Sequence, residues 1–474
     1  MNFPVIIQGG MGTGVSSWIL ANTVASAGQL GVVSGTAIDN IFIRRLQLGD
    51  PGGNMRRALE HFPFPDVARR LCNEYFIDGG KSPDKPFKTA PKFELQPSRE
   101  IQELFIVSNF CEVWLAKEGH AGVVGINLME KIQIPNIFSL YGAMLAGVDY
   151  VLMGAGIPRD IPGVLDSLAE HRDTSLRVRV EGASMDSDHR AWLRPRELFG
   201  DDLPPVKRPL FLAIVASAVL AKSLARKATG RVDGFVVETP WAGGHNAPPR
   251  GQMQLTESGE PIYGEKDNVD LADMKAIGLP FWIAGKCADP VTLQEVRAAG
   301  AQGIQVGTLF AFSEESAMDE AIKTELLAQA RRGECRIFTD PLASPTGFPF
   351  KVAQIEGTNS QQEVYLQRMR VCDLGYLRTP FIAEDGGIEY RCPAEPEKHF
   401  IQKGGAPGEL PGRKCLCNGL LANIGLPQKR GKQGHELPLV TAGDDLNKIA
   451  VLTQNGKESY SALDVIRYLL GEDV

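Results

Sequence analysis

Short apolar runs alternate with stretches of helical hydrophobic spacing along the first and larger part of the chain. Val5 to Ile7 has the length expected of a strand that is buried on both faces. A glycine-rich turn follows, hydrophobic residues recur at helical spacing from Trp18 to Ala27, and Gly31 begins a second apolar run. This alternation predicts βα units built around a parallel sheet.

The same pattern continues in seven further apolar segments, whose ends are rich in glycine, asparagine and other small residues. They lie at 121–128, 147–158, 175–180, 209–217, 232–240, 279–286 and 301–308. Strand ends of this kind are typical of the catalytic face of a (β/α)8 barrel, where the ligand-binding loops gather. The sequence therefore predicts an α/β fold, a (β/α)8 TIM barrel, within residues 1–340.

Two stretches interrupt this pattern. Residues from about 40 to 105 are rich in Gly, Pro and Lys, and we interpret them as an insertion after the second strand that carries short helices over the barrel mouth. Residues 341–474 are again rich in Gly and Pro, which favours a C-terminal extension packed on the barrel over an independent domain. Within it, Pro345 to Phe350 suits either a rigid lid or a plain surface turn.

Composition and charge narrow the class of protein. The 474 residues carry a net charge of −7, which disfavours a nucleic acid partner. The most apolar run, 210–221, is shorter than the ~20 residues that a membrane span needs, and no signal-like segment begins the sequence. Eight cysteines in a chain of this length do not form a disulfide scaffold. We therefore expect a cytoplasmic protein with no membrane partner.

Two consecutive strand ends predict a phosphate site. Residues 283–290 (IAGKCADP) and 303–310 (GIQVGTLF) each place a glycine where a strand turns towards a helix. The last two βα loops of many barrels bind phosphate through backbone N–H groups, and glycine allows the close approach. Thr308 adds a hydroxyl, whereas Lys286 suits either this site or an exposed loop position.

The segment 233–251 (DGFVVETPWAGGHNAPPRG) places a histidine on the same face. Its strand ends at Glu238, and Gly243 and Gly244 lead directly to His245. Two glycines let the backbone lie against a planar ligand while the imidazole enters the pocket. A free pKa near neutrality allows His245 to act as a base or as a hydrogen-bond donor.

Four cysteines fall within the extension, at 372, 392, 415 and 417. Four thiolates could bind zinc or an iron–sulfur cluster. The spacing lacks the paired CxxC pattern, and cysteine is also a small apolar core residue. Both points favour the burial of Cys372, Cys392, Cys415 and Cys417 as core residues without metal. A metal site remains the alternative.

Several segments taken together resemble a known family. PVIIQGGMG, AGVVGINL, VLMGAGIP, VVETPWAGGH, FWIAGK and GIQVGTLFAFSEES are similar, in this order, to the nitronate monooxygenase (2-nitropropane dioxygenase-like) family. FMN-dependent enoyl-acyl carrier protein reductases are related to it. The resemblance covers roughly residues 3 to 320. This chain has Gly285-Lys286 where the family usually has two glycines.

The resemblance implies FMN bound at the top of the barrel, with His245 taking a substrate α-proton or assisting the substrate beside the flavin. The cofactor contacts that it implies are Gly9, Gly10, Met11, Asn127, Gly154, Ala155, Ser217, Glu238, Gly243, Gly244, Ala284, Gly285, Gly307 and Thr308. Substrate choice is expected to depend on the insertion and on the C-terminal extension.

Three functions remain open at this point. The leading hypothesis is an FMN-dependent oxidoreductase of the nitronate monooxygenase type that oxidises a nitronate or nitroalkane with O2. An FMN enoyl-thioester reductase fed by NAD(P)H is the first alternative, with an acyl thioester as its substrate. A barrel that binds a phosphorylated metabolite without redox chemistry is the second. All three take a small molecule, and the sequence leaves the oligomeric state open.

Overall fold

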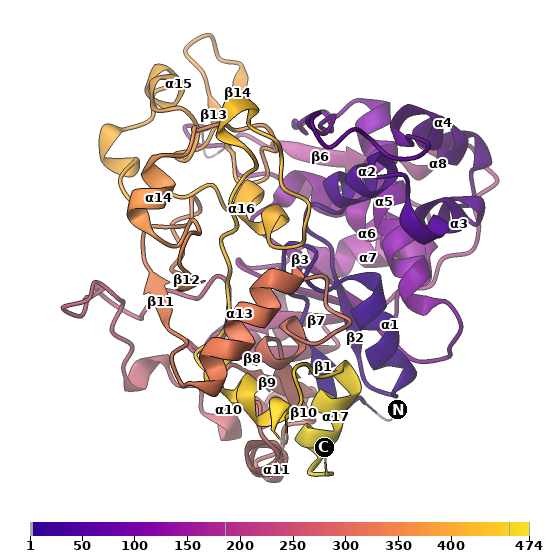
Figure 1. Ribbon diagram of the computed structural model, residues 1–474. Helices are drawn as coiled ribbons and strands as arrows, with labels where there is room; N and C mark the ends of the chain where they lie inside the picture. The colour runs from indigo at the N-terminus through magenta and orange to yellow at the C-terminus, as the bar shows by residue number, and fades with distance from the viewer. Residues whose placement is uncertain (1–2, 185, 455, 474) are drawn as a thin grey trace.

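Eight parallel strands form the centre of the computed structural model, which describes residues 3–184, 186–454 and 456–473. The strands lie in the order β1-β10-β9-β8-β7-β4-β3-β2, and a bridge between Ile7 and Leu30 joins the two ends of the sheet. The closed sheet and its covering helices confirm the predicted (β/α)8 barrel (Figure 1). The strands are β1 (Ile6–Gln8), β2 (Gly31–Ser34), β3 (Val124–Met129), β4 (Tyr150–Gly154), β7 (Leu210–Val215), β8 (Gly234–Glu238), β9 (Phe281–Ala284) and β10 (Gly303–Val306).

The prediction of a barrel strand at residues 175–180 is wrong. Residues 175–180 contribute to β5 (Thr174–Arg177), which pairs antiparallel with β6 (Arg190–Leu193) outside the barrel. A parallel barrel strand is covered on both faces, by the barrel interior and by the helices. The arginines at 177 and 179 are exposed, so this segment keeps its charged side on the surface.

Helices separate the barrel strands and cover the outside of the sheet (Figure 1). They are α1 (Trp18–Ser26), α6 (Gln133–Leu145), α7 (Ile161–Ala169), α8 (Pro195–Phe199), α9 (Ala218–Lys227), α10 (Leu271–Lys275), α11 (Pro290–Ala298), α12 (Thr308–Ala311) and α13 (Glu320–Arg331), with a 3₁₀ turn, η2, at Glu265–Asp267.

A long helical insertion follows β2. It consists of α2 (Ile38–Gln47), η1 (Pro51–Gly53), α3 (Asn54–Glu60), α4 (Pro65–Tyr75) and α5 (Arg99–Lys117). The helix α5 is buried along most of its length between α1, α2, α3 and α6. A Cβ at Gly142 of α6 would overlap the carbonyl oxygen of Ile106 in α5, so glycine is required for these two helices to approach so closely.

The chain after residue 336 continues across the barrel mouth and then returns along its side. Its elements are β11 (Ile337–Asp340), β12 (Phe350–Ala353), α14 (Gln362–Leu366), β13 (Thr379–Ile382), β14 (Ile388–Arg391), α15 (Glu397–Gln402), η3 (Pro407–Glu409), α16 (Leu416–Ala422), η4 (Gly431–Gln433), η5 (Leu446–Thr453) and α17 (Ala462–Leu470). The last helix, α17, packs against α1 and α11, so both ends of the chain lie on the same side (Figure 1).

The insertion and the extension meet above the barrel mouth. The phenol of Tyr376 donates a short hydrogen bond to the carboxylate of Asp39, and Asn40 donates to the same phenol over 2.8 Å. All three side chains are buried. Burial raises the pKa of Asp39 to about 6. This polar contact ties α2 to the segment between α14 and β13.

The barrel interior is a separate, fully apolar core. Ile7, Val32, Leu152, Val236 and Trp282 pack there with almost no exposed surface. The indole of Trp282 donates to the carbonyl of Pro4 over 2.9 Å, which satisfies its one polar group. No helix in the described ranges is both long and apolar enough to cross a bilayer.

Candidate active site

A cavity of about 240 Å³ lies at the carboxyl ends of the barrel strands. Loops that follow seven of the eight barrel strands line it, and residues of the insertion and the extension complete its walls. Most of the sequence-predicted site residues line this one chamber: Gly9, Gly10, Met11, Asn127, Gly154, Ala155, Glu238, Gly243, Gly244, His245, Ala284, Gly285, Gly307 and Thr308.

Ser217 is the predicted cofactor contact that is not among the lining residues. It stands at the N-cap of α9, where its hydroxyl accepts a hydrogen bond from the backbone N–H of Leu220. This is a common role of serine at the start of a helix. In this position Ser217 stabilises α9.

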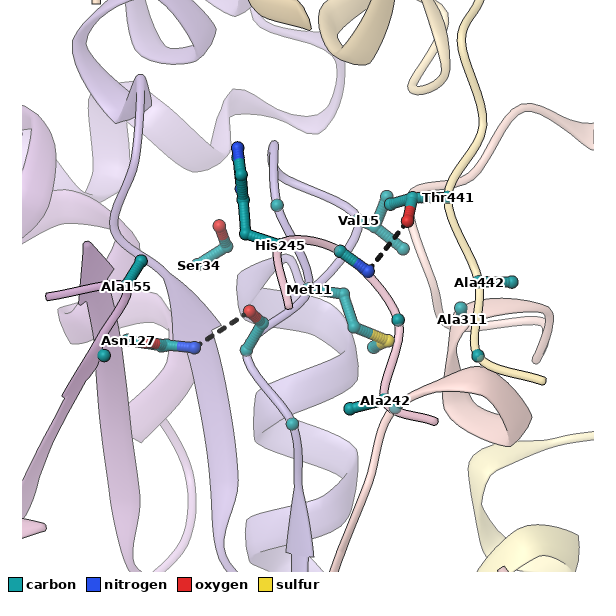
Figure 2. Close-up of a pocket in the computed structure, with 18 of the residues that line it drawn as sticks. Met11, Val15, Ser34, Asn127, Ala155, Ala242, His245, Ala311, Thr441 and Ala442 are labelled. Atoms are coloured by element: carbon teal, nitrogen blue, oxygen red, sulfur yellow. Dashed lines mark hydrogen bonds between the residues drawn. The ribbon is translucent and has the colours of Figure 1, made fainter. Parts of the chain in front are cut away.

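The turn after β1 is held against β3 at the floor of the chamber. The amide of Asn127 donates to the carbonyl of Gly10 over 3.1 Å (Figure 2). A Cβ at Gly10 would clash with the side chain of Asn127, so only glycine allows this contact. The hydroxyl of Ser16 holds the other side of the turn by accepting from the N–H of Met11 over 2.8 Å. The backbone of 9–11 is thereby fixed along the chamber floor.

His245 projects from its loop away from the strand ends (Figure 2). Its Nε2 lies 2.7 Å from the hydroxyl of Ser344, and its ring meets Phe350 edge-on with 4.8 Å between centroids. Burial, with a smaller contribution from the charge of Lys131, lowers the pKa of His245 to about 3. The imidazole is therefore neutral at physiological pH.

The pKa of Glu238, at the end of β8, is shifted in the opposite direction to that of His245. Burial raises the pKa of its carboxyl to about 8. At neutral pH this group is therefore mostly a neutral carboxylic acid. The chamber wall thus contains a proton-bearing acid at the end of β8 and, seven residues later in the loop that follows, an uncharged imidazole.

The predicted phosphate end is formed by the turns after β9 and β10. Gly285 has φ of +93°, and a Cβ there would crowd Thr239 and Ala242. Lys286 also has a positive φ, of +54°, but its side chain is exposed, with the amine 6.0 Å from the ring of Trp241. Thr308 opens α12, and its hydroxyl accepts from the backbone N–H of Gly443 over 2.9 Å.

Sequence patterns did not indicate Ser344, Lys351 and Thr441, which come from the extension. Ser344 contacts His245, and the hydroxyl of Thr441 accepts from the N–H of Gly244 over 2.8 Å (Figure 2). Phe350 lines the chamber, and Lys351 donates its N–H to the carbonyl of Gly244 over 3.0 Å. Phe350, at the end of the segment 345–350, packs against His245, so the segment is not a plain surface turn.

The floor of the chamber fits a flat ligand with a polar edge. Gln305 of β10 lines it, and its buried side-chain oxygen has no hydrogen-bond partner among the described residues. A buried oxygen of this kind lacks a donor, and a ligand N–H would supply one. Gly244, with φ of +82°, faces space in which a Cβ would meet nothing within 4 Å. Both observations are compatible with the isoalloxazine ring that the sequence resemblance implies.

The four cysteines of the extension do come together, at a small apolar pocket beside the chamber. Cys372, Cys392, Cys415 and Cys417 all line that pocket, and Cys417 also lines the main chamber. Burial raises the pKa of Cys415 and Cys417. Within the described part of the chain, no three His, Cys, Asp or Glu side chains are arranged to hold a metal ion.

Comparison with known proteins gives similarities to solved structures. FabK from Thermotoga maritima is 14% identical, with 99% of this chain and 92% of that chain covered and a TM-score of 0.46. Nitroalkane oxidase from Streptomyces ansochromogenes is 16% identical, with 99% and 96% covered and a TM-score of 0.42. The enoyl reductase domain of MlnA from Bacillus amyloliquefaciens is 12% identical, with 99% and 94% covered and a TM-score of 0.46.

No protein-family model matches the chain, and no curated protein matches it. The strand order and the placement of the chamber define the class: a (β/α)8 barrel with its candidate site at the carboxyl ends of the strands.

Proposed function

We propose that this chain is an FMN-dependent oxidoreductase. The observation that carries the proposal is the gathering of the glycine turns after β1, β8, β9 and β10 around one chamber with His245 in its wall. These turns are far apart in the sequence, and barrel closure brings their backbones to one site. A site of this form suits a planar ring with a phosphate tail.

The chain's own residues have distinct roles in this proposal. Gly9, Gly10 and Asn127 support the ring, Gln305 accepts a hydrogen bond from its polar edge, and Thr308 serves the phosphate. Bound FMN would supply two-electron transfer to or from a substrate. The protein orients the substrate, excludes water with the extension, and holds protons at Glu238 and His245.

Reduction of an enoyl thioester is the reaction that the chamber supports best. Its roof is apolar: Ile132 comes from the β3–α6 loop, Met318 precedes α13, and Leu377, Leu416 and Leu420 come from the extension. An apolar roof stabilises a hydrocarbon chain by about 25 cal/mol per Å² removed from water. A small nitroalkane has little surface to bury there.

The protonation states agree with this choice. A histidine with a pKa of about 3 is a weak base, poorly suited to remove an α-proton near neutral pH. A neutral imidazole can still donate a hydrogen bond to a carbonyl oxygen. We infer that His245 polarises the thioester carbonyl while Ser344 fixes the ring. Glu238, protonated at neutral pH, is the nearby proton source.

Nitronate oxidation is the second candidate. A nitronate is already an anion, so its oxidation requires no base. The charge of Lys131 acts on His245 and would attract an anion to the same wall. Because of this observation, the experiment below also tests the nitronate monooxygenase hypothesis.

The test uses purified protein loaded with FMN under anaerobic conditions. We expect NAD(P)H to bleach the visible flavin absorbance and a crotonyl thioester to restore it. His245→Ala should slow the thioester step by about 10²-fold or more, and His245→Gln, which keeps a donor, by less. Bleaching by a nitronate but not by NAD(P)H would select the second candidate. Protein that binds no flavin would exclude both.

A further inference from the structure

A short strap from the extension, Thr441–Asp445, lies directly on the candidate cofactor site. Thr441 accepts from the N–H of Gly244 over 2.8 Å, and Gly443 donates to the hydroxyl of Thr308 over 2.9 Å. The strap therefore contacts the histidine loop and the phosphate turn at once. A Cβ at Gly243 would come within 2.8 Å of the Ala442 carbonyl carbon, so the strap packs backbone against backbone.

The strap places a carboxyl group at the phosphate turn. The carboxyl of Asp445 lies beside the hydroxyl of Thr308, which acts to lower the pKa of that carboxyl. A Cβ built on Gly443 would lie 3.0 Å both from the Oδ1 of Asp445 and from the Oγ1 of Thr308, so these two oxygens flank Gly443. Asp445 is only 9% exposed and lines the chamber.

The charges around Asp445 do not neutralise it directly. The neighbouring Asp444 is paired with Lys351 over 2.7 Å, and Lys448 is paired with Asp289 over 2.9 Å. No Lys or Arg nitrogen in the described part of the chain lies within 4.0 Å of the Asp445 carboxylate, although the charge of Lys448 acts on it. Burial raises the pKa of Asp445, as expected for a carboxyl without a paired cation.

We propose that Asp445 sets the strength of phosphate binding at this site: its buried carboxyl lies beside the Thr308 hydroxyl and repels the cofactor phosphate. This inference rests on the proposed function, because it takes FMN as the ligand. The strap thereby makes the cofactor less tightly held and more readily exchanged than the glycine turns alone would allow. Two like charges in a poorly solvated site cost affinity that is regained when one of them is removed.

The proposed repulsion by Asp445 acts on the phosphate alone. Riboflavin, which has the same ring without the phosphate, is therefore the matched control ligand. The measurement is the dissociation constant of each flavin for the full-length apoprotein, by quenching of flavin fluorescence. We expect Asp445→Asn to tighten FMN binding by about tenfold and to leave riboflavin binding unchanged. Lys448→Gln should have the opposite effect: the dissociation constant of FMN should rise several-fold, while that of riboflavin should not change.

Asp202→Asn, which changes an exposed carboxylate after α8, should alter neither constant. An unchanged ratio of FMN to riboflavin affinity in Asp445→Asn, or weaker FMN binding, would overturn the inference while leaving the flavin function standing. Equal changes for both flavins would show that Asp445 acts through the shape of the chamber, and would also overturn it. Wild-type protein that binds neither flavin would instead refute the proposed function itself.

Discussion

Glu238 is the residue whose protonation should depend most visibly on folding. Its pKa of about 8 in the folded chain lies above the ~4.3 of an unfolded glutamate. A raised pKa gives stability that is complete below about pH 4.3 and is lost as the pH rises towards 8. Glu238→Gln removes this loss. In that pH window the free energy of unfolding of the variant should therefore rise relative to the wild type by up to about 1.4 kcal/mol per pH unit.

Thermal unfolding midpoints of the two proteins between pH 4.5 and 8.5 measure this difference. Glu257→Gln, which changes an exposed glutamate on the loop after His245, is the matched control and should follow the wild type at every pH. If the Glu238→Gln and wild-type curves run parallel, Glu238 is ionised in the folded chain.

His245 should show the opposite dependence. Its folded pKa of about 3 lies below the ~6.5 of an unfolded histidine. The stability is then complete above about pH 6.5 and is lost as the pH falls towards 3. His245→Gln should therefore become progressively more stable than the wild type on acidification below pH 6.5, as measured by urea unfolding at pH 7.5, 6.0 and 5.0. A constant difference across these three values would contradict an imidazole that stays neutral in the folded chain.

At the scale of residues, the positions predicted from the sequence come together at one chamber, whereas the contacts that the extension makes there were not predicted. The family resemblance implies Gly10 and Asn127, and the strand end with two glycines before it indicates His245. Parallel strands bring these three positions to one edge of the barrel. Ser344 and Thr441 lie about 100 and 200 residues after the histidine loop in irregular segments. Nothing in their own neighbourhood signals a contact that only the folded extension creates.

At the scale of elements, the closest helix contact of the insertion depends on one glycine. The face of α6 at Gly142 lies against the backbone of α5 at Ile106. Gly142→Ala must push these helices apart, and we expect it to cost about 1–3 kcal/mol even though alanine favours a helix. Gly264→Ala, where a Cβ meets nothing within 4 Å, is the control and should change stability little. Equal unfolding midpoints in denaturant for both variants would refute the close approach.

The erroneous barrel strand shows where element prediction from sequence reaches its limit. The segment 175–180 has the hydrophobic alternation of a strand, and it does form one, β5. Local alternation cannot distinguish a barrel strand from a surface hairpin, because both have period two. The arginines at 177 and 179 distinguish the surface hairpin from a barrel strand, because a barrel strand has no exposed face for charged side chains.

Across the whole molecule, the extension shares one hydrophobic core with the barrel. Val440, Ile449 and Leu469 belong to the same buried cluster as Leu20 of α1 and Leu326 of α13. A segment that contributes to a common core is not expected to fold or unfold separately. We therefore propose that residues 341–474 are part of one cooperative unit with the barrel.

The distribution of chromophores allows this to be measured without truncating the chain. All five tryptophans lie before residue 341, whereas four of the eight cysteines lie after it, at 372, 392, 415 and 417. Tryptophan fluorescence therefore follows the barrel and insertion, while labelling of these four thiols, located by peptide mapping, follows the extension. We expect both signals to give the same urea midpoint, with Cys111 of the insertion and Cys287 of the barrel labelled in the same transition. Exposure of the extension thiols at lower urea, with the tryptophan fluorescence still native, would show that the extension unfolds first.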